Sequence, residues 1–261
     1  MNHIKEFTVK MSSGKLCLGM VVTLTDPSVS ELAGEAGCDF TWIDMEHSPL
    51  SLECVLGHVI AARAARIAPL VRVPWNEWGV IKPVLDLAPA GIIIPMVNNA
   101  ADAAKAVASC RYPPKGNRGC GLRRGNRYGA MPFDEYLRIS EREPLVIVQI
   151  EHRDALKNLD DILAVEGIDS ICIGPYDLSG SFGKLGQIAD PEVSAAMDEI
   201  CRKARAAGKI IGTATALDDC NFELWRKRGL NWVAIAGDCG CMFTQLRRSL
   251  TELNQCMERK Q

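Results

Sequence analysis

The amino-acid sequence predicts an α/β protein built as a single (β/α)8 barrel, or TIM barrel, with an extra C-terminal helix. Its 261 residues are close to the length at which one such barrel is usually complete. Short apolar segments of strand length alternate with longer amphipathic segments, and no linker or low-complexity tract divides residues 1–261. The alternative arrangement for the same alternation is an open, doubly wound sheet.

The strand-like segments are continuously apolar, which is typical of parallel strands covered on both faces. They are Leu16–Leu24, Phe40–Asp44, Leu70–Val73, Gly91–Ile94, Leu145–Ile150, Ser170–Ile173, Ile210–Gly212 and Trp232–Ala236. The predicted helices between them are Val29–Ala36, Leu52–Arg66, Gly79–Leu87, Ala100–Arg111, Asp134–Ser140, Arg153–Val165, Pro191–Ala207 and Asp218–Arg228.

A final helix is predicted over Met242–Arg259. Apolar residues recur along it at helical spacing, namely Leu246, Leu250, Leu253 and Met257. This helix either packs on its own barrel or is exchanged between subunits. The whole chain, residues 1–261, is expected to be one domain.

The composition excludes several classes of function. With 48% hydrophobic residues, 24% charged residues and a net charge of −2, nothing favours binding to nucleic acid or to a membrane surface. No apolar run approaches the roughly 20 residues of a spanning helix, and residues 1–15 lack the apolar core of a secretory signal, so a cytoplasmic location is expected. The 11 cysteines are scattered and odd in number. They argue against a disulfide framework, and most are expected to be buried.

Polar residues end several of the predicted strands, where the chemistry of such a barrel is placed. Gln149 and Glu151 are two residues apart and therefore point to the same face, and Asp177 follows the next strand. Two carboxylates and an amide form a site of hard oxygen ligands, which suits Mg²⁺, Mn²⁺ or Co²⁺. The alternative is that Glu151 pairs with an arginine and that Asp177 caps a helix.

Arg72 lies near the end of a largely apolar strand, where a buried guanidinium needs an anion. A 2-oxo acid supplies one, although a structural ion pair with Glu151 or Asp44 is the alternative. His47 follows Asp44 and Glu46 at another strand end, and a carboxylate beside an imidazole suits a general acid–base catalyst. The alternative for His47 is an ordinary surface or hydrogen-bonded histidine.

A long basic loop is predicted between Arg111 and Arg127, because this segment is rich in Pro and Gly and has no acidic residue. Such a loop shapes the entrance for an anionic substrate, supports a subunit contact or is simply solvated. No lysine lies at a strand end, as a Schiff-base aldolase requires, and no nucleotide-binding glycine pattern follows the first strand. These absences favour metal–enolate chemistry.

Together these segments resemble the HpcH/HpaI aldolase family, whose members include 4-hydroxy-2-oxoheptanedioate aldolase and 2-dehydro-3-deoxyglucarate aldolase. The similarity covers roughly residues 14–240, and its stretches are GCDFTWIDMEHSPLS, PLVRVPWNE, IIIPMVNNAADAAKAV, RYPPKGNRG, VQIEHRDALKNLDDILAVEGIDSICIGPYDLSGSFG and DPEV. The resemblance implies a (β/α)8 barrel that binds Mg²⁺, Mn²⁺ or Co²⁺. It also implies a homo-oligomer, either a hexamer or a trimer of dimers.

The resemblance further implies how the substrate and the metal are held. It assigns the metal carboxylates to Glu151 and Asp177, and it places Gln149 near the pyruvate oxygens. The backbone amides of Tyr176 and Asp177 are expected to receive the pyruvate carboxylate. Arg72 is expected to contact the oxo group and the enolate.

The implied reaction is that of a metal-dependent (class II) pyruvate aldolase, a carbon–carbon lyase that splits a 4-hydroxy-2-oxo acid into pyruvate and an aldehyde. His47 is the implied base, with Asp44 in the supporting position. One alternative is an oxaloacetate decarboxylase or an acyl-CoA lyase that uses the same enolate-stabilising site. Another is a non-catalytic barrel that binds 2-oxo acids.

Three departures from the better-known family members stand out. Val21 replaces a tryptophan, Tyr176 replaces a small residue, and the segment Gly121–Asn126 replaces a run of small residues. All three are expected to lie where the aldehyde binds, so they leave the pyruvate half intact and concern the second substrate.

Overall fold

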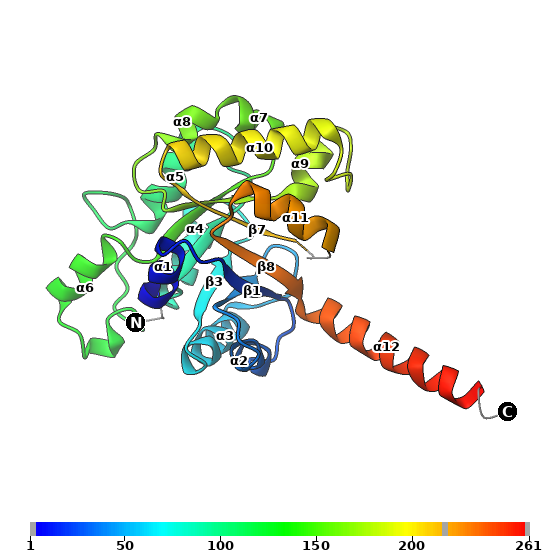
Figure 1. The fold of residues 1–261 in the computed structure, drawn as a ribbon. Coiled ribbons are helices and arrows are strands. Elements are labelled where there is room, and N and C mark those ends of the chain that lie inside the picture. The colour runs from blue at the N-terminus through cyan, green and yellow to red at the C-terminus, as the bar shows by residue number, and fades with distance from the viewer. Residues whose placement is uncertain (1–3, 216–218, 259–261) are drawn as a thin grey trace.

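The computed structural model describes residues 4–215 and 219–258, and within them eight parallel strands close into a barrel (Figure 1). Each strand pairs with its neighbours in chain order, and β1 pairs with β8 to complete the ring. The predicted (β/α)8 barrel is confirmed, and the ring of pairings excludes an open sheet. The strands are β1 (Cys17–Val22), β2 (Phe40–Asp44), β3 (Ala68–Arg72), β4 (Gly91–Ile94), β5 (Leu145–Ile150), β6 (Ser170–Ile173), β7 (Ile210–Ala214) and β8 (Trp232–Gly237).

Aromatic side chains fill much of the barrel interior. The ring centroid of Trp232 lies 5.6 Å from that of Phe40 and 6.0 Å from that of Trp42, and all three rings are buried. A Cβ atom at Gly212 would lie 1.8 Å from the Trp232 ring, so only glycine fits there. The helix α1 (Ile4–Ser12) packs its apolar side chains on this cluster. This packing leaves the carboxyl ends of the strands for polar side chains.

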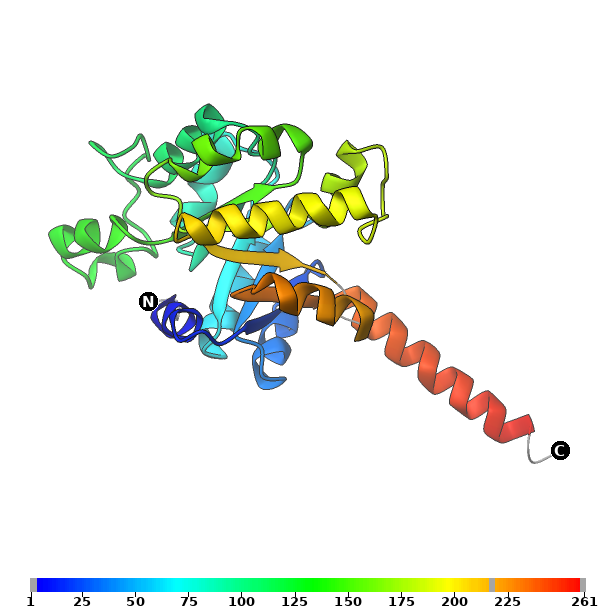
Figure 2. The same ribbon diagram turned by 45° about the horizontal axis from the view of Figure 1, so that its top comes forward.

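Helices surround the strands (Figures 1 and 2). They are α2 (Ser28–Glu35), α3 (Leu52–Ala64), α4 (Trp78–Asp86), α5 (Ala100–Cys110), α7 (Arg153–Lys157), α8 (Leu159–Leu163), α9 (Pro175–Ser181), α10 (Pro191–Ala206) and α11 (Asp219–Arg228). The helix α6 (Phe133–Ser140) stands apart to one side of the barrel (Figure 1), and a short 3-10 helix, η1 (Arg127–Gly129), precedes it in the chain. In the described ranges, no helix has the length and apolar content needed to cross a bilayer.

Most predicted elements have bounds close to those observed. The helix predicted over Arg153–Val165 is instead the pair α7 and α8, because the Asn158 side chain bonds two backbone carbonyls and interrupts the helix. The helices α1 and α9 were not predicted from the pattern. Asp218 and Arg259, the predicted ends of two helices, lie outside the described residues.

The last helix, α12 (Asp238–Glu258), begins at Asp238 rather than at Met242 and extends away from the barrel in both ribbon views (Figures 1 and 2). It therefore does not pack along its own barrel, which was one of the two predicted alternatives. Its large apolar side chains are exposed, namely Met242, Phe243, Leu246, Leu250, Leu253 and Met257.

Ten of the cysteines have side chains that the structure describes, and all ten are free thiols. Only four of them are fully buried: Cys17, Cys110, Cys172 and Cys201. The expectation that most cysteines are buried is therefore wrong for this part of the chain. The reason lies largely in α12, since three of the four exposed thiols lie on this extended helix: Cys239, Cys241 and Cys256.

Candidate active site

A cavity of about 200 Å³ opens at the carboxyl ends of the strands. Five of the residues predicted for the site line it, namely His47, Arg72, Gln149, Tyr176 and Asp177. The two others contact members of this group: Asp44 bonds Arg72, and Glu151 bonds Gln149. The structure therefore gathers all seven candidates around one opening, although their chemical roles do not follow from proximity alone.

Arg72 is buried and is held by two carboxylates. Its Nε atom donates to Asp44 Oδ1 at 2.9 Å, its Nη2 atom donates to Oδ2 at 2.6 Å, and its Nη1 atom lies 2.7 Å from Glu46 Oε2. Burial lowers the pKa of Arg72, but the hydrogen bonds and charge of Asp44, with Glu46, raise it above its ordinary value. The structural ion pair with Asp44 is therefore present. A guanidinium has five N–H donors, of which Asp44 takes two and Glu46 a third, so two remain for a substrate.

Glu151 lies just beyond the end of β5 and is 3% exposed. Its Oε1 atom accepts the backbone N–H of Met96 at 2.7 Å, and its Oε2 atom accepts a hydrogen bond from Gln149. Met96 has a φ of 54°, in the left-handed region that few side chains adopt, so the backbone is strained where it meets this carboxylate. A Cβ atom at Gly174 would lie 2.5 Å from Glu151 Oε2, which explains the glycine there.

Negative charge accumulates around Glu151. Burial, with the charges of Glu46 and Asp177, raises the pKa of Glu151 to about 7, against the Met96 hydrogen bond and the charge of Arg72. Burial also raises the pKa of Glu46, against the charges of Arg72 and His47. The alternative in which Glu151 forms an ion pair with an arginine is not seen among the described residues. The mouth thus has a surplus of carboxylates over cationic side chains.

The surplus of carboxylates at the mouth suits the binding of a divalent cation. Asp177 is exposed, and its carboxylate accepts no hydrogen bond within the described part of the chain, so it caps no helix there. The Oε1 atom of Gln149 is buried and also lacks a hydrogen-bond partner in these ranges. Within residues 4–215 and 219–258, no three His, Cys, Asp or Glu side chains enclose a metal position by themselves. The donors that fit are therefore the two carboxylates of Glu151 and Asp177, with the remaining positions left to water and substrate.

His47 lies at the rim, with its side chain 66% exposed and its Nε2 atom 3.9 Å from Glu46 Oε2. Asp44 contacts His47 through the backbone, since its Oδ1 atom accepts the N–H of His47 at 3.5 Å and that of Glu46 at 3.0 Å. Both Asp44 oxygens also bond Arg72, and its supporting role for the imidazole stays a prediction. The carboxylate nearest the imidazole is that of Glu46, which the sequence pattern named beside His47 but did not place among the site residues. Its two-residue spacing from Asp44 was the available signal, since Gln149 and Glu151 were found in the same way.

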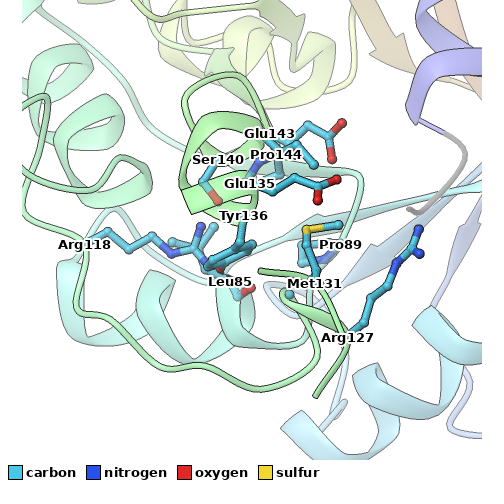
Figure 3. Close-up of a pocket in the computed structure, with 13 residues that line it drawn as sticks. Leu85, Pro89, Arg118, Arg127, Met131, Glu135, Tyr136, Ser140, Glu143 and Pro144 are labelled. Carbon is cyan, nitrogen blue, oxygen red and sulfur yellow. Dashed lines mark hydrogen bonds between the residues drawn. The ribbon is translucent and has the colours of Figure 1, made fainter. Parts of the chain in front are cut away.

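The basic loop lies away from the mouth. Its Arg118 donates to the Leu85 carbonyl and to Tyr136, at 3.2 Å in each case, and Arg124 donates to the Leu87 carbonyl at 3.0 Å. Leu85 and Leu87 precede β4, so these arginines lie toward the amino ends of the strands. A second cavity, of about 180 Å³, lies there between the loop, the end of α4 and α6 (Figure 3).

No residue of the basic loop lines the mouth cavity, so the loop does not shape the entrance of its own barrel. The segment Gly121–Asn126 is likewise absent from this cavity, and its expected place beside the aldehyde is wrong within one copy of the chain. The other two departures do line it, namely Val21 and Tyr176. A subunit contact by the loop stays a prediction.

A family model described as HpcH/HpaI aldolase/citrate lyase matches residues 18–243. The chain is 36% identical over 240 residues to a hydroxypyruvate/pyruvate aldolase of Roseobacter denitrificans, covering 92% of this chain and 93% of that protein. It is 35% identical to a 5-keto-4-deoxy-D-glucarate aldolase of Enterobacter, covering 90% and 91%. The crystal structure of an HpcH/HpaI aldolase from Desulfitobacterium hafniense superposes with a TM-score of 0.87 at 29% identity, covering 94% of this chain and 95% of that one.

Proposed function

Because the chain belongs to the HpcH/HpaI aldolase/citrate lyase family and is a carbon–carbon lyase acting on 2-oxo acids, we propose that it is a metal-dependent pyruvate aldolase. The reaction is the reversible cleavage of a 4-hydroxy-2-oxo acid to pyruvate and an aldehyde. The observation that carries this proposal is the mouth cavity, where one arginine is surrounded by a surplus of carboxylates. Relatives named for pyruvate and keto-sugar acids support the same substrate class.

The pyruvate half binds at the side of the cavity formed by β3, β5 and α9. The two uncommitted N–H groups of Arg72 face the 2-oxo oxygen, and they stabilise it as negative charge develops during cleavage. Gln149 lies beside the same oxygens. The backbone N–H groups of Tyr176 and Asp177 receive the carboxylate. Asp44 contributes indirectly, because its two hydrogen bonds fix the guanidinium plane.

Glu151 and Asp177 hold the divalent cation, which is Mg²⁺, Mn²⁺ or Co²⁺. When bound, it supplies Lewis-acid charge that favours the enolate form of pyruvate. Burial and neighbouring negative charge make Glu151 costly to ionise alone, and a cation offsets that cost. Glu151 follows β5 and Asp177 follows β6. These two strands are paired neighbours, which supports binding of one cation by both carboxylates.

His47 is the general base that accepts the proton of the C4 hydroxyl group during cleavage. Its exposed position at the rim allows transfer directly or through one water, and Glu46 stabilises the imidazolium that forms. Replacing His47 by alanine should lower kcat by roughly 10²- to 10⁴-fold, the usual contribution of a positioned proton transfer.

The direct test is a coupled assay of pyruvate release from a panel of 4-hydroxy-2-oxo acids, run with added Mg²⁺ or Mn²⁺ and with excess EDTA. Activity should require the metal and return when it is restored. Full turnover in EDTA would refute the metal-dependent scheme. Decarboxylation of oxaloacetate or cleavage of an acyl-CoA, without aldol turnover, would indicate the alternative lyases. Pyruvate binding by calorimetry without any turnover would indicate a non-catalytic binding barrel.

The proposed assembly is a homo-oligomer, a hexamer or a trimer of dimers. Its support is α12, whose exposed apolar side chains lie beyond the barrel and require a cover that a second copy of the chain can supply (Figure 2). Light scattering coupled to size exclusion should report a hexamer. Leu246→Glu with Leu250→Glu should dissociate it. A monomeric wild-type protein would refute the assembly.

A further inference from the structure

Asp238 opens α12 directly after β8, yet its carboxylate mainly serves another part of the chain. It accepts the backbone N–H groups of Thr23 at 2.7 Å and Leu24 at 2.8 Å, and the Thr23 hydroxyl at 2.7 Å. Only one hydrogen bond, from the N–H of Cys239 at 2.8 Å, comes from its own helix. A residue that merely started α12 would bond the second or third amide of that helix. Three of its four bonds instead hold the turn after β1.

The Asp238 carboxylate is buried and forms no ion pair with any residue in the described ranges. Burial raises its pKa, but the hydrogen bonds from Leu24 and Thr23 outweigh burial and lower the pKa below the ordinary value. A carboxylate held only by N–H and O–H donors is rigidly oriented, because each donor fixes one direction. The turn is therefore fixed by Asp238, and Asp238 is fixed by the turn.

The same turn is held from its other side by His58 in α3. The imidazole is fully buried, its Nε2 atom lies 2.9 Å from the Leu24 carbonyl, and its Nδ1 atom lies 2.9 Å from the Ser30 hydroxyl. Since a carbonyl only accepts, Nε2 carries the proton and donates it to Leu24. Burial lowers the pKa of His58, which agrees with a neutral ring. Both backbone groups of Leu24 are therefore hydrogen-bonded, the N–H to Asp238 and the C=O to His58.

This doubly held turn directly follows β1, a strand that reaches the mouth cavity. Val21, two residues before Thr23, lines the cavity and pairs in register with Gly237, the residue before Asp238. In the closed ring, β1 lies directly across the barrel from β5, which leads into Glu151. A substrate whose pyruvate half occupies the β5–β6 side extends its remaining carbons toward β1. The turn therefore lies where the aldehyde half arrives.

We infer that Asp238 is a positioning residue for the aldehyde half of the reaction, because it fixes the Thr23–Leu24 turn directly after β1. The inference rests on the aldolase function proposed above. The expected ligand on this side is the aldehyde carbon chain of the substrate. Changing the turn should alter aldehyde binding and leave pyruvate activation intact, since the pyruvate groups lie on other strands.

The test compares two half-reactions of Asp238→Asn. The first is deuterium incorporation at C3 of pyruvate in D₂O with Mg²⁺, followed by NMR, which requires only the pyruvate half. The second is aldol addition to a short aldehyde, measured as kcat and KM. Exchange should stay within about twofold of wild type, whereas kcat/KM for the aldehyde should fall about 10- to 100-fold through KM, the size expected for misplacing a binding wall.

The matched control is Asp190→Asn at the start of α10. Asp190 also accepts a backbone N–H near a helix start, from Glu192 at 2.9 Å, but the segment that it holds does not adjoin a residue that lines the mouth cavity. It should keep both half-reactions near wild type. Should Asp238→Asn fail to fold, Thr23→Val removes only the hydroxyl hydrogen bond, and Thr23→Ser restores it. The valine variant should raise the aldehyde KM and the serine variant should not.

Each outcome decides the inference. An unchanged aldehyde KM in Asp238→Asn overturns it, as does an equal loss of exchange and addition, which indicates general damage to the site. Equal behaviour of Thr23→Val and Thr23→Ser overturns it as well. If the wild-type protein exchanges pyruvate hydrogens but adds no aldehyde, or does neither, the aldolase proposal itself fails and the inference fails with it.

Discussion

The two ends of the barrel both bury charged side chains, and they neutralise them differently. Toward the amino ends, Arg118 and Arg124 donate to backbone carbonyls, and Arg118 also lies 4.0 Å from Asp86 and 4.6 Å from the centre of the Tyr112 ring. At the mouth, Arg72 is paired with Asp44 and Glu46, while Glu151 forms no ion pair with any residue that the structure describes. The carbonyls, the ring and one carboxylate stabilise the guanidinium groups of the amino end within the fold itself. The surplus of carboxylates at the mouth suits a cation from outside, and this difference is why we propose the mouth as the functional end.

Glu151→Gln is the substitution with the largest expected effect, and it tests whether the carboxylates at the mouth are needed for activity. It should lower metal-dependent turnover by at least about 10³-fold, because one of the two metal carboxylates is lost. Without metal, the variant should be more stable than wild type at pH 8, since the buried charge is gone. Steady-state kinetics and denaturation in EDTA measure the two effects. A variant that kept its activity would remove Glu151 from the site.

Arg72→Lys tests the other half of the mouth. A lysine keeps the charge but cannot bond both oxygens of Asp44 or keep a fixed pair of donors for the substrate. The expected loss in kcat/KM is about 10²- to 10³-fold, the range for removing a transition-state donor. Arg72→Met should cost at least as much. Near-normal kinetics in the lysine variant would show that Arg72 is only a structural partner of Asp44.

Stability of the metal-free protein should depend on pH through Glu151. Its pKa is about 7 in the folded chain and roughly 4.3 when unfolded. A carboxyl group with a raised folded pKa favours folding below the lower value, and this contribution is lost as pH rises through about 7. The whole change is about 4 kcal/mol. Mn²⁺ should therefore raise Tm more at pH 8 than at pH 5.5 in differential scanning fluorimetry, and Glu151→Gln should remove that difference.

The smallest effect on catalysis is expected at the amino end. Arg118→Met removes buried hydrogen bonds to Leu85 and Tyr136, so the free energy of unfolding should fall by about 1–3 kcal/mol. The kcat/KM value should stay within about twofold of wild type, as for a substitution far from the chemistry. A folded variant with abolished activity would mean that the amino end also takes part in function.

The strands and the family-like segments could be read from the sequence because both depend on local pattern. Continuous apolar runs specify buried parallel strands wherever they occur. Polar residues such as Glu151 and Asp177 follow those runs directly, so their position at the mouth follows from the fold class. The basic loop carried no such local signal. Its arginines lie toward the amino ends because carbonyls of residues before β4 hold them, and these contacts join distant parts of the chain.

The sequence by itself determined the barrel, the end of it that carries the candidate site and the residues gathered there. The reason is that the spacing of apolar residues and the order of the strands are both fixed along the chain. Tertiary structure alone decided which carboxylate meets which partner. It chose Asp44 rather than Glu151 as the partner of Arg72, brought Glu46 nearest to the imidazole and attached Asp238 to the turn after β1. Hydrogen bonds and ion pairs depend on distances of about 3 Å, and packing of side chains far apart in sequence sets such distances.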